Sequence, residues 1–396
     1  MREVVIVSAG RTPIGDYFGS LKALSAVDLG VIALKGTLDK IMLKPDLIEE
    51  VVAGHCIQSA CKGNTGRQVA LGAGCSIETV GVTVNQMCPS SMRATEILAQ
   101  EIQLGKVDIG AVVGMESMSN APYLLPKARG GYRMGNGELL DAMLYDALID
   151  AFMGYHMGVT AENLAEMYQI SREEQDELAL LSHRRAVQAI SEGKFKQEIV
   201  PVELKAKKGN IIFDTDEHPN AEASRESLAK LRPAFKPDGT VTAGNASSLN
   251  DGASALILCE ANKAVELGLK PLAKIKSTAS ASVDPKIMGI GVVPAIRRAL
   301  HFAGLQQDQI GYWEINEAFA AQFLAANREL KLDLDIVNAN GSGCSLGHPV
   351  GNSGARLIVS LVHEMRRRGV RYGCASLCAG GGPAVAIVVE NPDYSD

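Results

Sequence analysis

The sequence contains no run approaching 18 consecutive apolar residues, although 46% of the chain is hydrophobic. This argues against a membrane-spanning helix. The first ten residues hold one short strand-like run, Val4–Val7, and lack the basic segment, long apolar stretch and cleavage site of a signal peptide. We therefore expect a cytoplasmic protein, whose 396 residues bury a large core and divide into two or three domains.

The chain also lacks an excess of positive charge and any long block of like charge. Its net charge is −6, so nothing electrostatic favours a nucleic acid or an anionic membrane as a partner. The pairs Cys56/Cys61 and Cys374/Cys378 have the wrong spacing for a zinc site, and no paired histidines lie nearby, so we expect no metal. Without a secretory signal, all eight cysteines are expected to be reduced thiols.

Glycine-rich runs are present, but they do not match the common nucleotide-binding motifs. Neither Gly341–Gly351 nor Leu377–Gly382 continues into Gly-Lys-Ser/Thr or fits the dinucleotide fingerprint. Backbone N–H groups in such turns can cradle a phosphate, and they can equally stabilise an oxyanion.

Strand-like and helix-like runs alternate along the chain, which is typical of an α/β fold. The pattern also repeats at a nearly constant offset. The offset is 262 residues from Ala33 to Ala295, 263 from Ser90 to Ser353 and 264 from Ala111 to Ala375. The repeat predicts two structurally similar halves packed as a pseudo-dimer.

One stretch has no counterpart in the repeat. Residues 119–242 are richer in charge, Gly and Met, and include a capping box, Ser171 to Glu174, before a long amphipathic helix reaching about Ile190. We expect an inserted domain there, with one half formed by 1–118 plus 243–269 and the other by 270–396.

Cys88 follows the strand-like run Val80–Val84 and precedes the helix-compatible run Met92–Leu104. Pro89 suits the first helical position. A thiol at a helix N-terminus feels the positive end of the dipole, which favours the nucleophilic thiolate. The alternative is an inert core cysteine, which is common.

Three further clusters carry reactive groups: Asn316–Ala320 after a strand, His348 in the glycine-rich loop, and Cys378 before Gly380. By the repeat, Gly351 takes the place of Cys88, so His348 and Cys88 should approach each other across the pseudo-twofold axis. Alone, His348 could be a core histidine and Cys378 a packed small side chain. Together they form a nucleophile–base arrangement with oxyanion donors.

These motifs resemble the thiolase family from end to end, most closely its biosynthetic acetyl-CoA acetyltransferases. The matching segments are Asn85–Ala94, Tyr155–Gly158, Thr240–Asp251, Asn316–Ala320, Gly347–Pro349 and Cys378–Gly382. The resemblance implies a five-layered αβαβα core with an inserted loop domain covering coenzyme A. It also implies reversible Claisen condensation of two acetyl-CoA to acetoacetyl-CoA and CoA, with no permanently bound cofactor.

Residue roles follow from the resemblance alone. Cys88 would take the acetyl group, His348 would draw off its proton, and Cys378 would remove the α-proton of the second acetyl-CoA. His348 and a water held by Asn316 would form one oxyanion hole, and the N–H groups of Cys88 and Gly380 the other. Claisen chemistry needs such a division, because one cysteine cannot be the acylated nucleophile and the base in the same step.

The resemblance also implies substrate contacts and a homotetramer, with Ala121–Asp141 pairing dimers. The expected acyl and CoA contacts are His156, Met157, Ser247, Leu249, Met288 and Phe319, of which Met157 and Met288 would shorten the acyl pocket. Candidates for the ADP phosphates are Lys207, Lys208 and Arg225, although solvated surface charge is the commoner explanation for each.

The chain departs from the family pattern near the site. Ser91 and Ser248 stand where glycine is usual, and Ser342, Cys344 and Ser345 replace smaller or apolar residues. If the hydroxyls of Ser91 and Ser248 entered the channel, they would alter selectivity; alternatively, both bond the local main chain. The alternatives for function are a thiolase for another short 3-ketoacyl-CoA, a ketosynthase-like condensing enzyme, and a non-catalytic CoA- or acyl-binding protein.

Overall fold

The computed structural model describes residues 1–207 and 209–395, so the candidate Lys208 lies outside the described residues. The strands are β1 (Val4–Arg11), β2 (Gly15–Asp16), β3 (Glu50–Gly54), β4 (Val80–Val84), β5 (Ile109–Ser117), β6 (Tyr123–Leu124), β7 (Leu140–Asp141), β8 (Val202–Leu204), β9 (Ile211–Phe213), β10 (Asn250–Glu260), β11 (Ala273–Ser282), β12 (Ile310–Ile315), β13 (Tyr372–Cys378) and β14 (Pro383–Glu390). The α-helices are α1 (Ala26–Asp39), α2 (Thr65–Gly72), α3 (Ser90–Gln103), α4 (Gly158–Met167), α5 (Arg172–Ser191), α6 (Arg225–Ala229), α7 (Ala261–Glu266), α8 (Val292–Ala303), α9 (Ala320–Leu330), α10 (Gly343–Leu346) and α11 (Ser353–Arg368).

The predicted repeat is visible in the strand order. The first half runs β4-β3-β5-β10-β1 and the second runs β12-β13-β14-β11, with the same sequence of parallel and antiparallel pairings. Val337 makes a parallel bridge to Trp313 on β12, in the position that β4 takes beside β3. The halves also join directly, since Val5 and Ile6 of β1 pair with Lys274 and Ala273 of β11.

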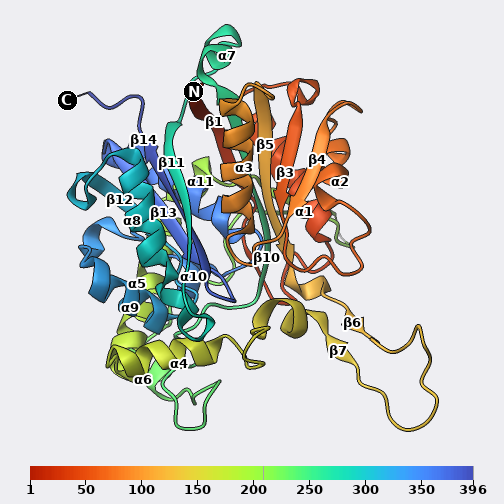
Figure 1. Cartoon of the computed structure of the whole chain (residues 1–396), viewed down its shortest axis with the longest axis vertical. Helices are drawn as coiled ribbons and strands as arrows, with labels where there is room; N and C mark the ends of the chain where they lie inside the picture. Colours follow the sequence, from red (N-terminus) through yellow and green to blue (C-terminus); the bar gives the residue numbers. More distant parts are fainter. Residues whose placement is uncertain (208, 396) are drawn as a thin grey trace.

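Five layers follow from how the side chains alternate. On β1, Val4 and Ile6 face the central core while Val5 and Val7 face an outer core, because successive strand residues point to opposite sides. Helices α3 and α11 pack on each other and on both half-sheets, α1 and α2 cover the outer face of the first half, and α8 covers that of the second. Figure 1 shows β1, β3, β4, β5 and α1 to α3 of the first half in warm colours, its strand β10 in green, and the second half in teal to blue, with α3 and α11 between the two half-sheets.

The insertion supplies the elements at one end of this core. As predicted, Ser171 and Glu174 form a capping box at the start of α5. Figure 1 shows α4 and α6 beneath the second half and the β6–β7 hairpin extending away from the body as a long arm. The division of the chain at residues 118, 242 and 269 stays a prediction. None of the described helices combines the length and apolar character of a membrane span.

Candidate active site

Cys88 sits in a tight turn between β4 and α3. Met87 before it adopts φ +58, a left-handed conformation that a non-glycine residue rarely takes and that costs of order 1 kcal/mol or more. Two side chains hold this turn: Asn85 Oδ1 accepts from the N–H of Met87 at 2.9 Å, and Ser90 Oγ accepts from the N–H of Gln86 at 2.9 Å. The turn therefore presents the thiol in a fixed direction.

The prediction of an acidic Cys88 thiol is wrong. Burial raises its pKa to about 12, against the opposing effect of hydrogen bonds from the backbone N–H groups of Gly380 and Cys88. Pro89 also precedes the helix as its N-cap, one position earlier than predicted, and α3 begins at Ser90. The thiol therefore needs a nearby base. The same two N–H groups are the donors that the thiolase resemblance implies for an oxyanion.

His348 is the base that the structure offers. It lines the same cavity as Cys88, and burial together with the charge of Arg356 lowers its pKa to about 3, so the imidazole is neutral at pH 7. Its Nδ1 lies 2.6 Å from Ser353 Oγ, whose hydroxyl is 3.0 Å from the carbonyl of Pro349. A hydroxyl has only one hydrogen, and that of Ser353 is donated to the carbonyl of Pro349. The Ser353 oxygen must therefore accept a hydrogen bond from Nδ1–H of His348. Nε2 then carries the lone pair.

Asn316 lies beside this ring. Its Nδ2 is 3.4 and 3.5 Å from the two ring nitrogens of His348, at the outer limit of a hydrogen bond, and its Oδ1 is buried with no partner among the described residues. The N–H of Asn316 donates to the carbonyl of Ser376 at 3.1 Å, which fixes the residue at the end of β12. An unpaired acceptor beside an imidazole suits the predicted role of holding a water.

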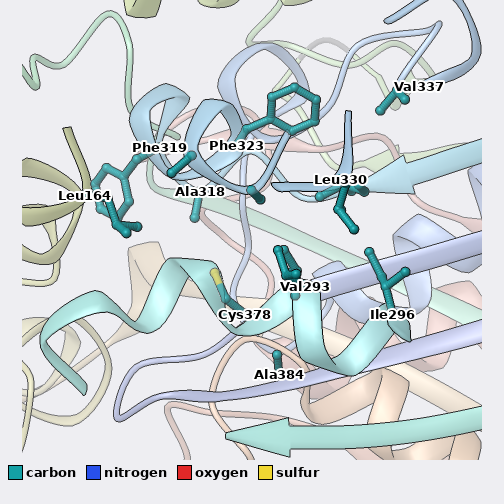
Figure 2. Packing of buried hydrophobic residues seen from close by; sticks show 14 of the residues in the cluster. Leu164, Val293, Ile296, Ala318, Phe319, Phe323, Leu330, Val337, Cys378 and Ala384 are labelled. Atoms are coloured by element: carbon teal, nitrogen blue, oxygen red, sulfur yellow. The ribbon is translucent and has the colours of Figure 1, made fainter. Parts of the chain in front are cut away.

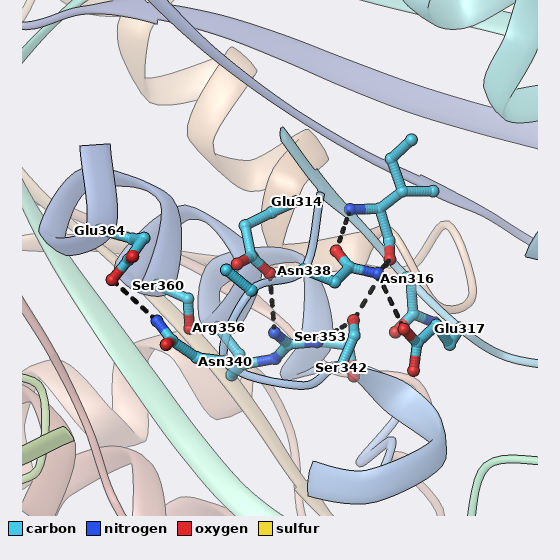
Figure 3. Close-up of polar contacts among 12 residues, drawn as sticks. Glu314, Asn316, Glu317, Asn338, Asn340, Ser342, Ser353, Arg356, Ser360 and Glu364 are labelled. Carbon is cyan, nitrogen blue, oxygen red and sulfur yellow. Dashed lines mark hydrogen bonds and ion pairs between the residues drawn. The ribbon is translucent and has the colours of Figure 1, made fainter. Parts of the chain in front are cut away.

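A buried polar network supports Asn316 from below, and Figure 3 shows its members around Arg356. Asn338 bonds both the N–H and the carbonyl of Ile315, at 2.8 and 2.7 Å, and donates to Glu317 at 3.0 Å. Ser342 Oγ donates to the same carbonyl of Ile315 at 3.2 Å. The network holds the loop rigidly, because each of these buried contacts satisfies a polar group.

Ser342, Cys344 and Ser345, which differ from the usual family residues in the glycine-rich loop, belong to this network and do not line the acyl cavity. Ser345 Oγ lies 2.8 Å from Ser182 Oγ, which donates to Glu317 at 2.6 Å. Cys344 is buried, with its thiol toward the carbonyl of Glu317 at 3.6 Å. These side chains therefore affect how the glycine-rich loop is held in place and do not alter the shape of the acyl cavity.

Cys378 ends β13 within an apolar cluster. Figure 2 shows it among Leu164, Ala318, Phe319 and Val293. Burial raises the pKa of this thiol, and the neighbouring charge of ionised Cys88 raises it further. The two cysteines are thus close enough to interact electrically, and both are free thiols.

Gly380 sits in the turn after Cys378, and a side chain there would meet the flexible end of Met157. A Cβ there would lie 1.9 Å from Met157 Cε, so any other residue would displace that methionine. Gly381 and Gly382 follow with φ of +83 and +102, conformations that favour glycine. The turn thereby places the N–H of Gly380 against the Cys88 thiol.

One cavity of about 470 Å³ unites the predicted binding residues. It is mostly apolar and is lined by Cys88 and His348 and by all six predicted contacts: His156, Met157, Ser247, Leu249, Met288 and Phe319. Cys378, Asn316 and Gly380 do not line it, although Gly380 donates to the Cys88 thiol and Asn316 lies beside the His348 ring. The His156 ring stacks on Phe235, which also lines the cavity, with centroids 4.5 Å apart.

The described candidates for binding the ADP phosphates, Lys207 and Arg225, do not line this cavity. Arg225 Nη2 donates to Glu177 at 3.0 Å on the surface, and Lys207 is exposed. No group of three or more His, Cys, Asp or Glu side chains within residues 1–207 and 209–395 is arranged to hold a metal ion.

Ser91 does not enter the cavity. Its Oγ accepts from the N–H of Ala355 at 2.8 Å and donates to the carbonyl of Asn352 at 3.1 Å, so it caps α11 from the neighbouring helix α3. Asn352, the N-cap residue of α11, makes no such bond itself. Ser248 does line the cavity, but its Oγ donates to Asn250 Oδ1 at 2.7 Å.

We expect Ser91→Gly to reduce stability without changing selectivity. The substitution strands a buried N–H and loosens the start of α3, at a cost of about 1–3 kcal/mol. The midpoint of thermal unfolding should fall by a few degrees. The ratio of kcat/KM on acetoacetyl-CoA to that on a six-carbon 3-ketoacyl-CoA should equal the parent's. A changed ratio would show that the hydroxyl shapes the channel after all.

Three features of the site were missed in the sequence: the left-handed Met87, the Ser353 contact with His348, and the effect of the Arg356 charge on that ring. Ser353 and Arg356 lie five and eight positions after His348, on the helix that its loop opens, and this adjacency was the available signal. Nothing in the sequence marks the conformation of Met87.

Comparison with known families decides the identity. Family models described as "Thiolase, N-terminal domain" and "Thiolase, C-terminal domain" match residues 4–262 and 269–391. The chain belongs to the thiolase family. The predicted thiolase fold is likewise confirmed: a solved acetyl-CoA acetyltransferase of Syntrophomonas wolfei superposes with a TM-score of 0.97 at 48% identity, covering 99% of this thiolase and all of that chain.

Curated relatives agree over the full length of the thiolase. An acetyl-CoA acetyltransferase of Escherichia coli is 49% identical over 391 residues, 98% of this chain and 99% of the relative. A β-ketothiolase of Cupriavidus necator is also 49% identical, with the same coverage. A solved human mitochondrial 3-ketoacyl-CoA thiolase in complex with CoA has a TM-score of 0.95 at 40% identity, covering 98% of each chain.

Proposed function

We propose that this thiolase is an acetyl-CoA C-acetyltransferase, which interconverts two acetyl-CoA with acetoacetyl-CoA and CoA. The observation that carries the proposal is the pairing of Cys88 with a neutral His348 on one apolar cavity, with a second thiol, Cys378, electrically coupled to the first. Full-length relatives named acetyl-CoA acetyltransferase support it. An intact nucleophile, base and second thiol disfavour a non-catalytic binding protein.

In the first half-reaction, Cys88 passes its proton to Nε2 of His348 and its sulfur attacks the thioester carbonyl. The negative charge that develops on the carbonyl oxygen is received by the N–H groups of Cys88 and Gly380, which already converge on the sulfur. When the tetrahedral adduct collapses, CoA leaves as a thiolate and takes up the proton of Cys378, while His348 keeps the proton from Cys88 on Nε2. The acetyl group remains on Cys88.

In the second half-reaction, Cys378 removes a proton from the α-carbon of a second acetyl-CoA. The enolate oxygen is stabilised by Nε2–H of His348 and by a water held on Asn316. The α-carbon then attacks the acetyl group, and the Cys88 sulfur leaves with the proton from Nε2 of His348. Because burial raises the pKa of Cys378, its thiolate is a strong base toward a weak carbon acid.

Ser353 should set the tautomer of His348 in both steps. We expect Ser353→Ala to lower kcat by roughly 10- to 100-fold, because Nδ1 loses its acceptor and the proton can move to Nε2. Ser353→Thr, which keeps the hydroxyl, should recover most of the rate. Ser360→Ala removes a buried hydroxyl two turns along the same helix and serves as the control. Equal rates in Ser353→Ala and the parent would contradict the assignment.

The acyl pocket supports a short substrate. Met157 and Met288 are almost fully buried in the cavity wall, beside Phe319. Thiolysis of acetoacetyl-CoA should therefore exceed that of longer and branched 3-ketoacyl-CoAs in kcat/KM. A preference for the longer substrates would instead support a thiolase for another 3-ketoacyl-CoA.

We also propose a homotetramer in which residues 119–242 both cover CoA and connect dimers. Two observations support it. The edge strand β4 exposes Val80 and Val82, and the arm formed by β6, β7 and their connection exposes several large apolar side chains, among them Tyr123, Leu125 and Met134. Light scattering should give four times the chain mass of 41.9 kDa.

A further inference from the structure

His218 is a polar side chain in the wall of the otherwise mostly apolar cavity that holds Cys88. It lies in the segment between β9 and α6, and none of the sequence motifs includes it. Its side chain is 26% exposed, whereas Cys88, Met157 and Met288 are at most 7% exposed. His218 therefore lies toward the open end of the cavity, while the reactive sulfur and the acyl pocket lie at the closed end.

The Nδ1 edge of the His218 ring is held by a hydrogen bond. Its Nδ1 is 2.8 Å from Asp16 Oδ1, and because a carboxylate only accepts, Nδ1 carries the hydrogen. Asp16 in turn accepts from Asn250 Nδ2 at 3.3 Å. Asn250 Oδ1 accepts from the N–H of His348 at 2.9 Å. The ring is thus tied to the same residue that anchors the catalytic loop.

A second histidine supports the segment from behind. His183 on α5 lies with its ring centroid 5.8 Å from that of His218, and its Nδ1 accepts from the N–H of Asn220 at 3.2 Å. His183 does not line the cavity. The remaining ring nitrogen of His218, Nε2, has no partner among the hydrogen bonds of the described residues and belongs to a side chain on the cavity wall.

We propose that Nε2 of His218 accepts a hydrogen bond from the outer half of the pantetheine arm, from its second amide N–H or its hydroxyl. In the neutral ring, Nδ1–H donates to Asp16 and Nε2 offers a lone pair, which complements those two donors. The arm is long and polar, while most of the wall is apolar, so each polar wall group fixes its register. His218 is then a binding residue that sets how deeply the thioester reaches toward Cys88.

This inference rests on the proposed use of CoA thioesters. The test is therefore run on acetoacetyl thioesters of CoA, of pantetheine and of N-acetylcysteamine. The last substrate keeps the inner amide but lacks the outer half of the arm. Acylation of Cys88 separates the two half-reactions, so kcat/KM for the acetoacetyl thioester reports on that substrate alone.

Two substitutions of His218 distinguish the role of Nε2 from that of Nδ1. The shorter amide in His218→Asn keeps a donor toward Asp16 but cannot reach the position of Nε2, whereas His218→Gln places an amide there. We expect His218→Asn to raise KM about 3- to 10-fold for the CoA and pantetheine thioesters with little change in kcat, the loss of one neutral hydrogen bond. His218→Gln should recover most of this, and the N-acetylcysteamine thioester should not distinguish the variants.

His183→Asn is the matched control, because it alters the neighbouring ring without touching the cavity; its KM should equal the parent's. An unchanged KM in His218→Asn would overturn the proposal. So would equal losses in His183→Asn and His218→Asn without recovery in His218→Gln, which would mean loop support only. An effect confined to the CoA thioester would place the contact on the nucleotide and overturn the assignment to pantetheine. Inactivity of the parent on acetoacetyl-CoA would instead refute the proposed function.

Discussion

Cys88→Ser should lose covalent labelling by acetyl-CoA, and kcat should fall by about three orders of magnitude or more. A serine hydroxyl is a much weaker acid than a thiol, and the buried site already disfavours the anion, as the raised pKa of Cys88 shows. Intact-protein mass spectrometry after incubation with acetyl-CoA would report the acetyl adduct, and peptide mapping would locate it.

Cys56→Ser is a suitable control for that experiment. Cys56 is a buried cysteine that does not line the cavity. Its thiol lies 3.6 Å from Oγ of Ser90, the first residue of the helix α3 that follows Cys88. It should still acquire the acetyl group on Cys88. Labelling that survived in Cys88→Ser and vanished in Cys378→Ser would reverse the roles of the two thiols.

Cys378→Ser should separate the half-reactions. Acetyl-enzyme should still form at Cys88, because the nucleophile, His348 and the N–H donors remain. Exchange of the acetyl-CoA α-protons with solvent deuterium should collapse, and condensation should fall by about three orders of magnitude or more, because a hydroxyl is a poor base for a carbon acid. Nuclear magnetic resonance of acetyl-CoA in deuterated buffer measures the exchange.

Cys374→Ser is the matched control for this variant. Cys374 lies four residues earlier on the same face of β13 and is equally buried in the same apolar cluster. It undergoes the same change of sulfur to oxygen without touching the reacting groups, so its exchange rate should match the parent's. Parent-like exchange in Cys378→Ser would exclude the proposed role of that thiol.

Local signals predicted many elements well. Val80–Val84 is a strand with the predicted bounds, and α3 differs from the predicted run Met92–Leu104 by two residues at its start and one at its end. Alternating apolar residues and caps encode such elements within a few residues of sequence. The repeat extended this to the arrangement of the halves, because two segments with one pattern fold alike.

The failures concern properties that depend on distant parts of the chain. The acidity of Cys88 could not be read from its helix, because burial outweighs the local N–H donors. The side chain of Ser91 could have pointed to the channel, and only the packing of α3 against α11 directs it to Ala355. The cavity position of His218 likewise depends on how residues 119–242 meet the core.

The pairing of β1 on both sides has a consequence for how the chain is made. β1 leaves the ribosome well before its partners, because one edge pairs with β10 and the other with β11, about 250 and 270 residues later. The apolar side chains on both faces of β1 cannot pack before those strands have been synthesised, and contacts between residues so far apart in sequence form slowly. β1 is thus secured late although it is synthesised early, and until its partners emerge both of its edges are open to wrong association.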